Sequence, residues 1–254
     1  MTILIKFYSL ASSSSANAYI YQFNDLIILV DVGLSRKKIV EKLKEINIDL
    51  SMVNVILLTH EHSDHIKGVD VLLKQVDARL ITSSGTASNI NTEYTVEHVN
   101  AGDKLTLNGE VDVEIVKASH DASDAIGFIF HADGDKFVHI TDTGYILNEN
   151  VDKFKGAYSY TIESNYEEEV LIVNDKYPFR IKQRILSEVG HMSNIDCNQF
   201  LIDNITDNTQ FVQFAHLSEN NNNPELVEQL NESLPVTNKT VLLKDEIIEV
   251  NLCK

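Results

Sequence analysis

The sequence predicts an α/β (α+β) fold in which two β-sheets are covered by helices. Short runs rich in β-branched and aromatic residues alternate along the chain with longer helical patterns. Several strand-like runs lead directly into loops that carry polar residues, which favours mixed sheets covered by helices. The length of 254 residues suits one large domain or two small ones, and a hydrophobic content of 43% is ordinary for a globular protein.

The expected elements follow from local patterns. The run Val-Asn-Val-Ile-Leu-Leu at 53–58 has the length and β-branched content of a buried strand. In chain order, strands are expected at 3–9, 18–23, 26–30, 53–58, 79–82, 104–107, 111–118, 126–131, 136–141 and 210–215. Helices are expected at 35–46, 69–75, 167–173, 178–188, 194–203 and 224–231. Ser193 is in position to cap the helix at 194–203, and Pro224 to open the last helix after the Asn-rich loop 220–223.

The segment 57–65, Leu-Leu-Thr-His-Glu-His-Ser-Asp-His, carries the densest group of metal-type ligands. His60 and His62 lie two apart in extended chain, so they point the same way and can share one ion. Asp64 and His65 follow after the chain turns, where they can hold a second ion nearby. The alternative is a histidine-rich polar turn. Nine histidines in 254 residues make three within six an improbable coincidence.

Three later strand-like runs also end in a metal-type residue. The run 111–119 leads into His120, the run 137–141 into Asp142, and the run 211–215 into His216. Each of these residues alone is more often structural and hydrogen-bonded than a ligand. Their order after the first cluster gives them weight as ligands.

The seven residues resemble, in chain order and separation, the ligand pattern of the metallo-β-lactamase fold family: His60-x-His62-x-Asp64-His65, then His120, Asp142 and His216. The resemblance implies one domain over residues 1–254, folded as a four-layer αββα sandwich with its site at one edge. It also implies two divalent metal ions. By that pattern the first ion binds His60, His62 and His120, the second binds Asp64, His65 and His216, and Asp142 bridges both. Imidazole and carboxylate ligands without thiolate suit Zn(II), Mn(II) or iron.

Further segments are similar to the ribonuclease Z and YycJ (WalJ) branches of that family. They are Ser-His-Asp-Ala at 119–122, Glu-Ser-Asn-Tyr at 163–166, Gly-His-x-Ser-Asn at 190–194 and His-Leu-Ser-x-x-Asn-Asn-x-Pro at 216–224. The YycJ-like branch implies phosphodiester hydrolysis, usually by a DNA exonuclease. The loop 12–17 resembles the small-residue loop of that branch but lacks its usual glycines and cysteine, which leaves the substrate side of the site open.

The resemblance also implies that Glu163 pairs with His191 and that His191 is not a metal ligand. In the expected reaction, two ions lower the pKa of a water that attacks phosphorus in line. His191, oriented by Glu163, protonates the leaving alkoxide, which is otherwise a poor leaving group. The catalytic residues expected on this basis are His191, Glu163 and Asp64, and Asp64 is also expected to be a ligand.

The formal charge of −17 bears on the substrate. A surface this acidic repels polyanions at long range, and the one basic run, 36–38, is interpreted as an exposed helix face. Within phosphodiester chemistry two substrates therefore compete. The YycJ-like segments favour DNA ends, whereas the charge favours cyclic nucleoside monophosphates, which phage anti-Pycsar proteins of this fold degrade. Processing of transfer RNA 3′ ends ranks third.

Outside phosphodiester chemistry, a thioester or lactone hydrolase uses the same metal core but does not need the Glu163 and His191 pair. A non-catalytic scaffold protein is disfavoured because all seven ligand positions are filled. A flavin-linked di-iron redox protein is disfavoured because no flavin-binding domain follows the core.

The remaining expectations concern the structural residues and the setting of the protein. His98 and His131 are interpreted as surface residues and His139 as structural, while Asp31 is expected either to support a ligand or to form a turn. Two cysteines, Cys197 and Cys253, give no disulfide framework. No apolar run approaches the roughly 20 residues that span a bilayer. The N-terminus lacks the basic start of a secretion signal, so a cytoplasmic location is expected, and a homodimer is expected by analogy.

Overall fold

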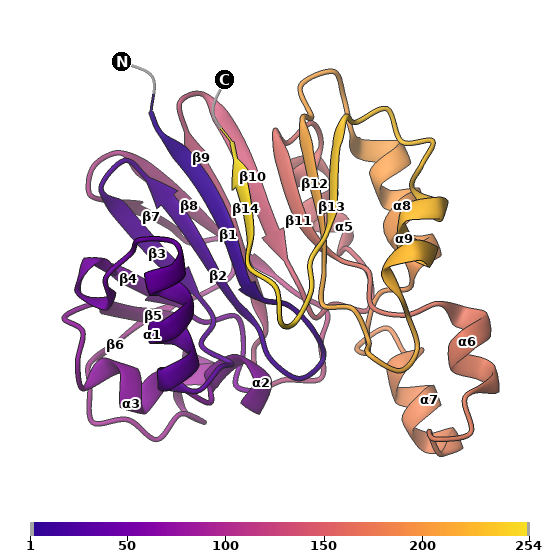
Figure 1. Ribbon diagram of the computed structural model, residues 1–254, viewed down its shortest axis with the longest axis horizontal. Coiled ribbons are helices and arrows are strands. Elements are labelled where there is room, and N and C mark those ends of the chain that lie inside the picture. The colour runs from indigo at the N-terminus through magenta and orange to yellow at the C-terminus, as the bar shows by residue number, and fades with distance from the viewer. Residues whose placement is uncertain (1–2, 253–254) are drawn as a thin grey trace.

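The computed structural model describes residues 3–252, and Cys253 lies outside them. Two seven-stranded sheets lie face to face in the middle of the molecule, with helices on the outer side of each (Figure 1). Helices α1 and α3 cover one sheet, whereas α5, α8 and α9 cover the other (Figure 1). This arrangement confirms the predicted αββα sandwich. Within residues 3–252 no helix is long and apolar enough to cross a membrane.

The first sheet has the strand order β14-β1-β2-β3-β4-β5-β6. Its bounds are β1 Ile5–Ala11, β2 Ala18–Phe23, β3 Leu26–Val30, β4 Val55–Leu57, β5 Arg79–Ser83, β6 Val96–Val99 and β14 Ile248–Asn251. The pairs from β3 to β6 are parallel, so the carboxyl ends of these strands meet at one edge.

The second sheet has the strand order β13-β12-β11-β10-β9-β8-β7. Its bounds are β7 Lys104–Leu107, β8 Val111–Lys117, β9 Ile126–Ala132, β10 Asp135–Ile140, β11 Ser159–Glu163, β12 Phe211–Ala215 and β13 Asn238–Val241. The pairs from β10 to β13 are parallel, and Glu163 pairs with Ala215, the residue before His216. The register therefore places Glu163 and His216 side by side at one edge of the sheet.

The helices lie mostly in the connections between strands. Their bounds are α1 Arg36–Glu45, α2 Ser63–Ile66, α3 Val69–Leu73, α4 Ser84–Ala87, α5 Asn148–Phe154, α6 Glu168–Val173, α7 Phe179–Ile185, α8 Asn194–Asn204 and α9 Pro224–Leu230, with a short 3₁₀ turn at Leu50–Met52. Ser193 caps α8, as predicted, because its side chain accepts a hydrogen bond from the Asp196 backbone N–H at 3.0 Å. Asn223 caps α9 in the same way, and Pro224 occupies its first turn.

Buried strands point side chains alternately into two cores. In β3, Ile28 and Val30 face the opposite sheet, whereas Ile27 and Leu29 face the covering helices. All five β3 residues are buried because a strand covered on both faces has no solvent side. A continuous apolar run such as 26–30 is the sequence signature of this position.

Four strands were not predicted: β6, β11, β13 and β14. Their sequences, VEHV, SYTIE, NKTV and IEVN, contain polar residues and lack a long apolar run. Strands β6, β13 and β14 lie at sheet edges, where one side faces solvent. Strand β11 is central and fully buried, and its polar groups are satisfied internally; Thr161 Oγ1, for example, lies 2.9 Å from Tyr21 Oη. The short helices α2, α4 and α5 were also missed.

Candidate metal centre

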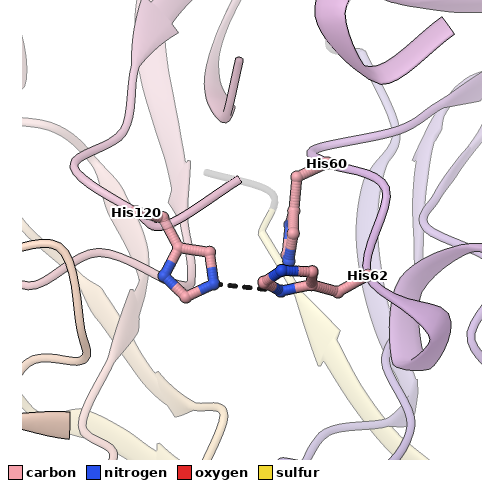
Figure 2. A group of neighbouring side chains, drawn as sticks. All are labelled: His60, His62 and His120. Atoms are coloured by element: carbon pink, nitrogen blue, oxygen red, sulfur yellow. Dashed lines mark hydrogen bonds between the residues drawn. The ribbon is translucent and has the colours of Figure 1, made fainter. Parts of the chain in front are cut away.

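Three histidines from two separate loops meet at one point. His60 and His62 follow β4, and His120 follows β8 from the other sheet (Figure 2). One ring nitrogen from each lies within 4.8 Å of the others. His62 Nδ1 and His120 Nε2 are 3.2 Å apart. The sequence-predicted first group is thus assembled by the face-to-face packing of the two sheets.

A second group lies beside the first. Ligand atoms of Asp64, His65 and His216 also lie within 4.8 Å of one another. Asp142 sits between the groups, with its Oδ2 3.3 Å from His65 Nε2 and its Oδ1 3.3 Å from His216 Nε2. Its Oδ1 is also 3.8 Å from His120 Nε2 in the first group. The structure therefore brings all seven predicted residues together, with Asp142 in the middle.

Three of the site residues follow their strands with a left-handed backbone. Asp31, Asp142 and His216 have φ angles of 59°, 53° and 59°. Such conformations are uncommon for residues other than glycine and concentrate at functional sites. The turn they produce directs each side chain inward at the strand end. Gly33 fixes the loop from the other side, because a Cβ there would lie 1.6 Å from the Asp64 carbonyl oxygen.

The outer ring nitrogen of four histidines is held by the protein. His65 Nδ1 lies 2.7 Å from Asp31 Oδ2, and His216 Nδ1 lies 2.8 Å from Glu163 Oε1. In the first group the partners are neutral. His60 Nδ1 lies 3.0 Å from Thr59 Oγ1, and His120 Nδ1 lies 3.0 Å from the Gly190 carbonyl oxygen. These contacts fix the ring orientations and turn Nε2 toward the centre, the usual arrangement around a metal.

Three inward-facing atoms have no hydrogen-bond partner within residues 3–252. They are His60 Nε2, His216 Nε2 and Asp142 Oδ2, and all three are buried. Leaving buried polar atoms unpaired is costly, so such atoms in a native site call for a ligand. The donors are imidazole nitrogen and carboxylate oxygen, which divalent cations such as zinc accept. The residues present therefore fit a divalent metal ion.

The two groups differ in their protonation. Burial lowers the pKa of His60 well below its usual value and also lowers that of His120. In the second group burial acts in the same direction, but the Asp142, Asp64 and Glu163 carboxylates outweigh it and raise the pKa of His216 to about 10. Asp142 and Asp31 likewise raise the pKa of His65 against the effect of burial. The second group thus attracts positive charge strongly.

Glu163 joins the second group to a further histidine. Its Oε1 lies 2.8 Å from both His216 Nδ1 and His191 Nδ1. Its Oε2 accepts hydrogen bonds from the backbone N–H groups of Thr143 and Met192, at 2.8 and 3.2 Å. The carboxylate is fully buried and holds both rings, while the His191 side chain keeps 17% of its surface exposed. The structure thus pairs Glu163 with His191, as the sequence predicted.

Other sequence predictions can be placed as well. Asp31 both forms a turn and supports His65, and it also accepts the Thr59 backbone N–H at 2.9 Å. His139 is fully buried with Nδ1 3.1 Å from Tyr21 Oη, which fits a structural role. His98 is exposed, and His131 is partly exposed.

Three supporting residues around the ligands were not predicted. Thr59 Oγ1 contacts Asp31, His60 and His65. The side-chain nitrogen of Asn17 lies 3.1 Å from His65 Nε2, and that of Asn165 donates to the His216 carbonyl oxygen at 2.7 Å. Asn165 belongs to the branch-like segment 163–166 and Asn17 to the loop 12–17, but only the assembled site reveals which ligands they contact.

Comparison with known families agrees with this geometry. Residues 27–204 match the family described as Beta-lactamase superfamily domain, and the chain belongs to this family. In Bacillus subtilis, the metallo-β-lactamase fold protein YhfI has a similar crystal structure, with a TM-score of 0.73. That similarity covers 97% of this chain and all of the YhfI chain at 13% sequence identity, so it shows the fold alone.

Two named relatives are more similar in sequence. The chain is 38% identical over 229 residues to a Bacillus anthracis protein named Exodeoxyribonuclease YycJ, covering 87% of this chain and 86% of the relative. It is 37% identical over 228 residues to a Streptococcus pneumoniae serotype 2 protein named Exodeoxyribonuclease WalJ, covering 87% of this chain and 84% of the relative. The resemblance to the YycJ (WalJ) branch is confirmed.

Proposed function

We propose that this protein is a metal-dependent hydrolase of nucleotide phosphodiester bonds. The observation that carries the proposal is the Glu163 carboxylate, which holds both His216 of the ligand cluster and His191 at the rim. A hydrolase that expels an alkoxide needs a proton donor near its metal site, and this carboxylate places one there. A cluster serving only to bind metal has no use for the His191 contact.

In this proposal the seven clustered side chains hold two divalent ions. His60, His62 and His120 form one subsite, Asp64, His65 and His216 form the other, and Asp142 contacts both. Zn(II) or Mn(II) suits the nitrogen and oxygen donors, since no thiolate is present. When bound, the two ions activate water near neutral pH and neutralise charge on the phosphate.

The remaining steps belong to the side chains of the chain itself. Glu163 accepts the Nδ1 hydrogen bond of His191, which leaves His191 Nε2 without a hydrogen-bond partner among residues 3–252. We assign His191 to deliver a proton to the leaving oxygen, and Glu163 to orient its ring and balance its charge. Asp64, whose side chain is 21% exposed, is the ligand carboxylate that reaches toward the substrate side.

Single-stranded DNA ends are the substrate we favour. Both named relatives are exodeoxyribonucleases by name, and this chain covers more than four fifths of each. Cyclic nucleoside monophosphates remain the second candidate, because the net charge of −17 repels long polyanions more than small ones. A homodimer and a cytoplasmic location stay predictions; light scattering on purified protein tests the first.

A substrate panel tests the proposal. Zinc- or manganese-loaded protein is incubated with 5′-phosphorylated single-stranded DNA, cyclic nucleoside monophosphates, precursor transfer RNA and an acyl thioester. We expect DNA to be degraded fastest, with shortening from an end. Turnover of the thioester alone, surviving His191→Ala, would replace the proposal with an acyl hydrolase. Turnover of cyclic nucleotides alone would keep the chemistry and change the substrate.

A further inference from the structure

The segment 167–190, here called the α6–α7 hairpin, projects from the body of the molecule on the same side as α2, which follows the first histidine pair (Figure 1). None of the seven residues of α7 is buried. Six exposed large hydrophobic side chains belong to the hairpin: Ile172, Val173, Phe179, Ile181, Leu186 and Val189. Phe179 is 74% exposed. A helix that buries none of its residues, yet displays an aromatic ring, is typical of a surface that receives a partner.

The hairpin leads directly into the metal centre. The carbonyl oxygen of Ile185, the last residue of α7, accepts a hydrogen bond from the His191 backbone N–H at 3.0 Å. The Val189 carbonyl oxygen accepts one from the backbone N–H of Asp121, the residue after His120, at 2.9 Å. A ligand lying along α7 therefore arrives at the proposed proton donor.

The α7 part of the hairpin is positively charged, although the hairpin as a whole has five acidic residues, at 167–169, 175 and 188, and four basic ones. Residues 176–184 contain four cationic side chains and no acidic one: Lys176, Arg180, Lys182 and Arg184. Arg184 is paired with Asp121, but the other three have no carboxylate partner within residues 3–252. The predicted helix at 178–188 was not recognised as basic because its cations alternate with other residues. In a chain of net charge −17, it is a place where a polyanion can be held.

Charge decides between the two partners that an aromatic and basic helix could receive. A second copy of this chain, meeting the first across a two-fold axis at α7, would bring the cationic side chains of two α7 helices together. A nucleic-acid strand instead brings phosphates to the cations and bases to the exposed ring. Cationic side chains beside exposed aromatic rings are the recurring design of single-strand-binding surfaces.

We propose that Phe179 and Arg180 form a docking site for the single-stranded DNA that enters the metal centre, an inference that rests on the proposed function. A base stacks on Phe179, and a phosphate contacts Arg180. The five helical steps from Arg180 to Ile185 span about 7.5 Å along the helix. That length corresponds to about two stacked nucleotide steps of 3.4 Å. The site thus holds the strand a short way from the reacting bond.

Binding is measured apart from turnover, so that this inference and the proposed function fail separately. The probe is a labelled, phosphorothioate-linked thymidine strand of about 12 nucleotides, within the usual site sizes. Fluorescence anisotropy with metal-loaded protein compares wild type with Phe179→Ala and Arg180→Gln. Lys37→Gln is the control for net charge, because it removes one exposed positive charge from α1, outside the hairpin, where Lys37 Nζ lies 3.8 Å from Glu41 Oε1.

We expect Phe179→Ala to weaken binding about 5- to 150-fold, the range for loss of one base–aromatic stack. Arg180→Gln should weaken binding at low salt and reduce the slope of log affinity against log salt by about 0.7, the value for one phosphate contact. Lys37→Gln should change neither. Turnover of bis(p-nitrophenyl) phosphate, a diester too small to reach α7, should be unchanged in both hairpin variants.

Three results would overturn the inference. The first is a wild-type protein that does not bind the strand. The second is equal weakening by Arg180→Gln and Lys37→Gln, which would mean that only net charge matters. The third is a dimer in light scattering that Phe179→Ala converts to a monomer, which would assign the hairpin to a second copy. Absence of diester turnover, with strand binding as expected, would instead count against the proposed function.

Discussion

The two halves of the metal centre contain the same kind of side chain in different surroundings. His60 and His120 are backed by a hydroxyl group and a carbonyl oxygen, whereas His65 and His216 are backed by the Asp31 and Glu163 carboxylates. Burial keeps the first pair neutral, while carboxylates raise the pKa of the second pair. The group that contacts the outer ring nitrogen of a buried histidine thus helps to set whether its pKa is lowered or raised.

This difference between the two halves affects both metal binding and the proposed catalysis. Neutral imidazoles in the first half are ready to accept an ion at neutral pH, whereas the second half must release protons to do so. Glu163 also holds His191, so the carboxylate-backed half is the one linked to the proposed proton donor. Changes there should affect metal binding and chemistry together, and the predictions below test that asymmetry.

The largest effect is expected where the halves join. Asp142→Ala removes the carboxylate that approaches both groups, so each half loses a ligand and the repulsion between two dications is no longer offset. Turnover should be abolished, and metal content by atomic emission should fall from two ions per chain to below one. His98→Ala, which removes an exposed histidine away from the cluster, should leave both quantities unchanged. Full metal retention in Asp142→Ala would remove its bridging assignment.

The next effect separates chemistry from binding. His191→Ala removes the proposed proton donor but none of the seven ligands, so turnover should slow roughly 10²- to 10⁴-fold with both ions retained. Parallel metal analysis and DNA-cleavage rates check this. Loss of an ion along with activity would mean that His191 is itself a ligand.

A smaller effect is expected from Glu163→Gln, which keeps the shape of the side chain and removes its charge. The His216 ring loses its anionic support, so the second ion should bind roughly 10- to 100-fold more weakly. The first ion should bind as before, because neither His60 nor His120 touches Glu163. Calorimetric titration of metal-free protein resolves the two steps. Equal weakening of both would erase the proposed difference between the halves.

The smallest effect is a difference in pH dependence. With a pKa of about 10, His216 is protonated at pH 7 in the metal-free protein, and an ion must displace that proton. Because the pKa of His65 is raised as well, affinity for the second ion should rise at least tenfold per pH unit between pH 6 and 8, whereas the lowered pKa values of His60 and His120 give the first ion a shallower profile. In metal-free protein the raised pKa stabilises the fold fully below pH 6.5, and this stabilisation is lost as pH rises through about 10. Titrations at several pH values check the two slopes.

The sequence indicated the ligands well because each follows a strand, and parallel strands end at one edge. Strands buried on both faces, such as 26–30, were predicted equally well from their continuous apolar runs. Strand β11 was missed because its polar residues are paired inside the sheet, so nothing in Ser-Tyr-Thr-Ile-Glu marks it as buried. The contacts of Thr59 with Asp31 and of Asn165 with His216 join residues 28 and 51 positions apart, which no local pattern records.

The central claim is that the centre holds two ions, one in each half. Anomalous diffraction at the zinc edge, from crystals of zinc-loaded protein, tests it most directly. We predict two peaks, one contacted by His60, His62 and His120 and the other by Asp64, His65 and His216, with Asp142 touching both and His191 touching neither. A single peak, or a peak bound by His191, would contradict the account.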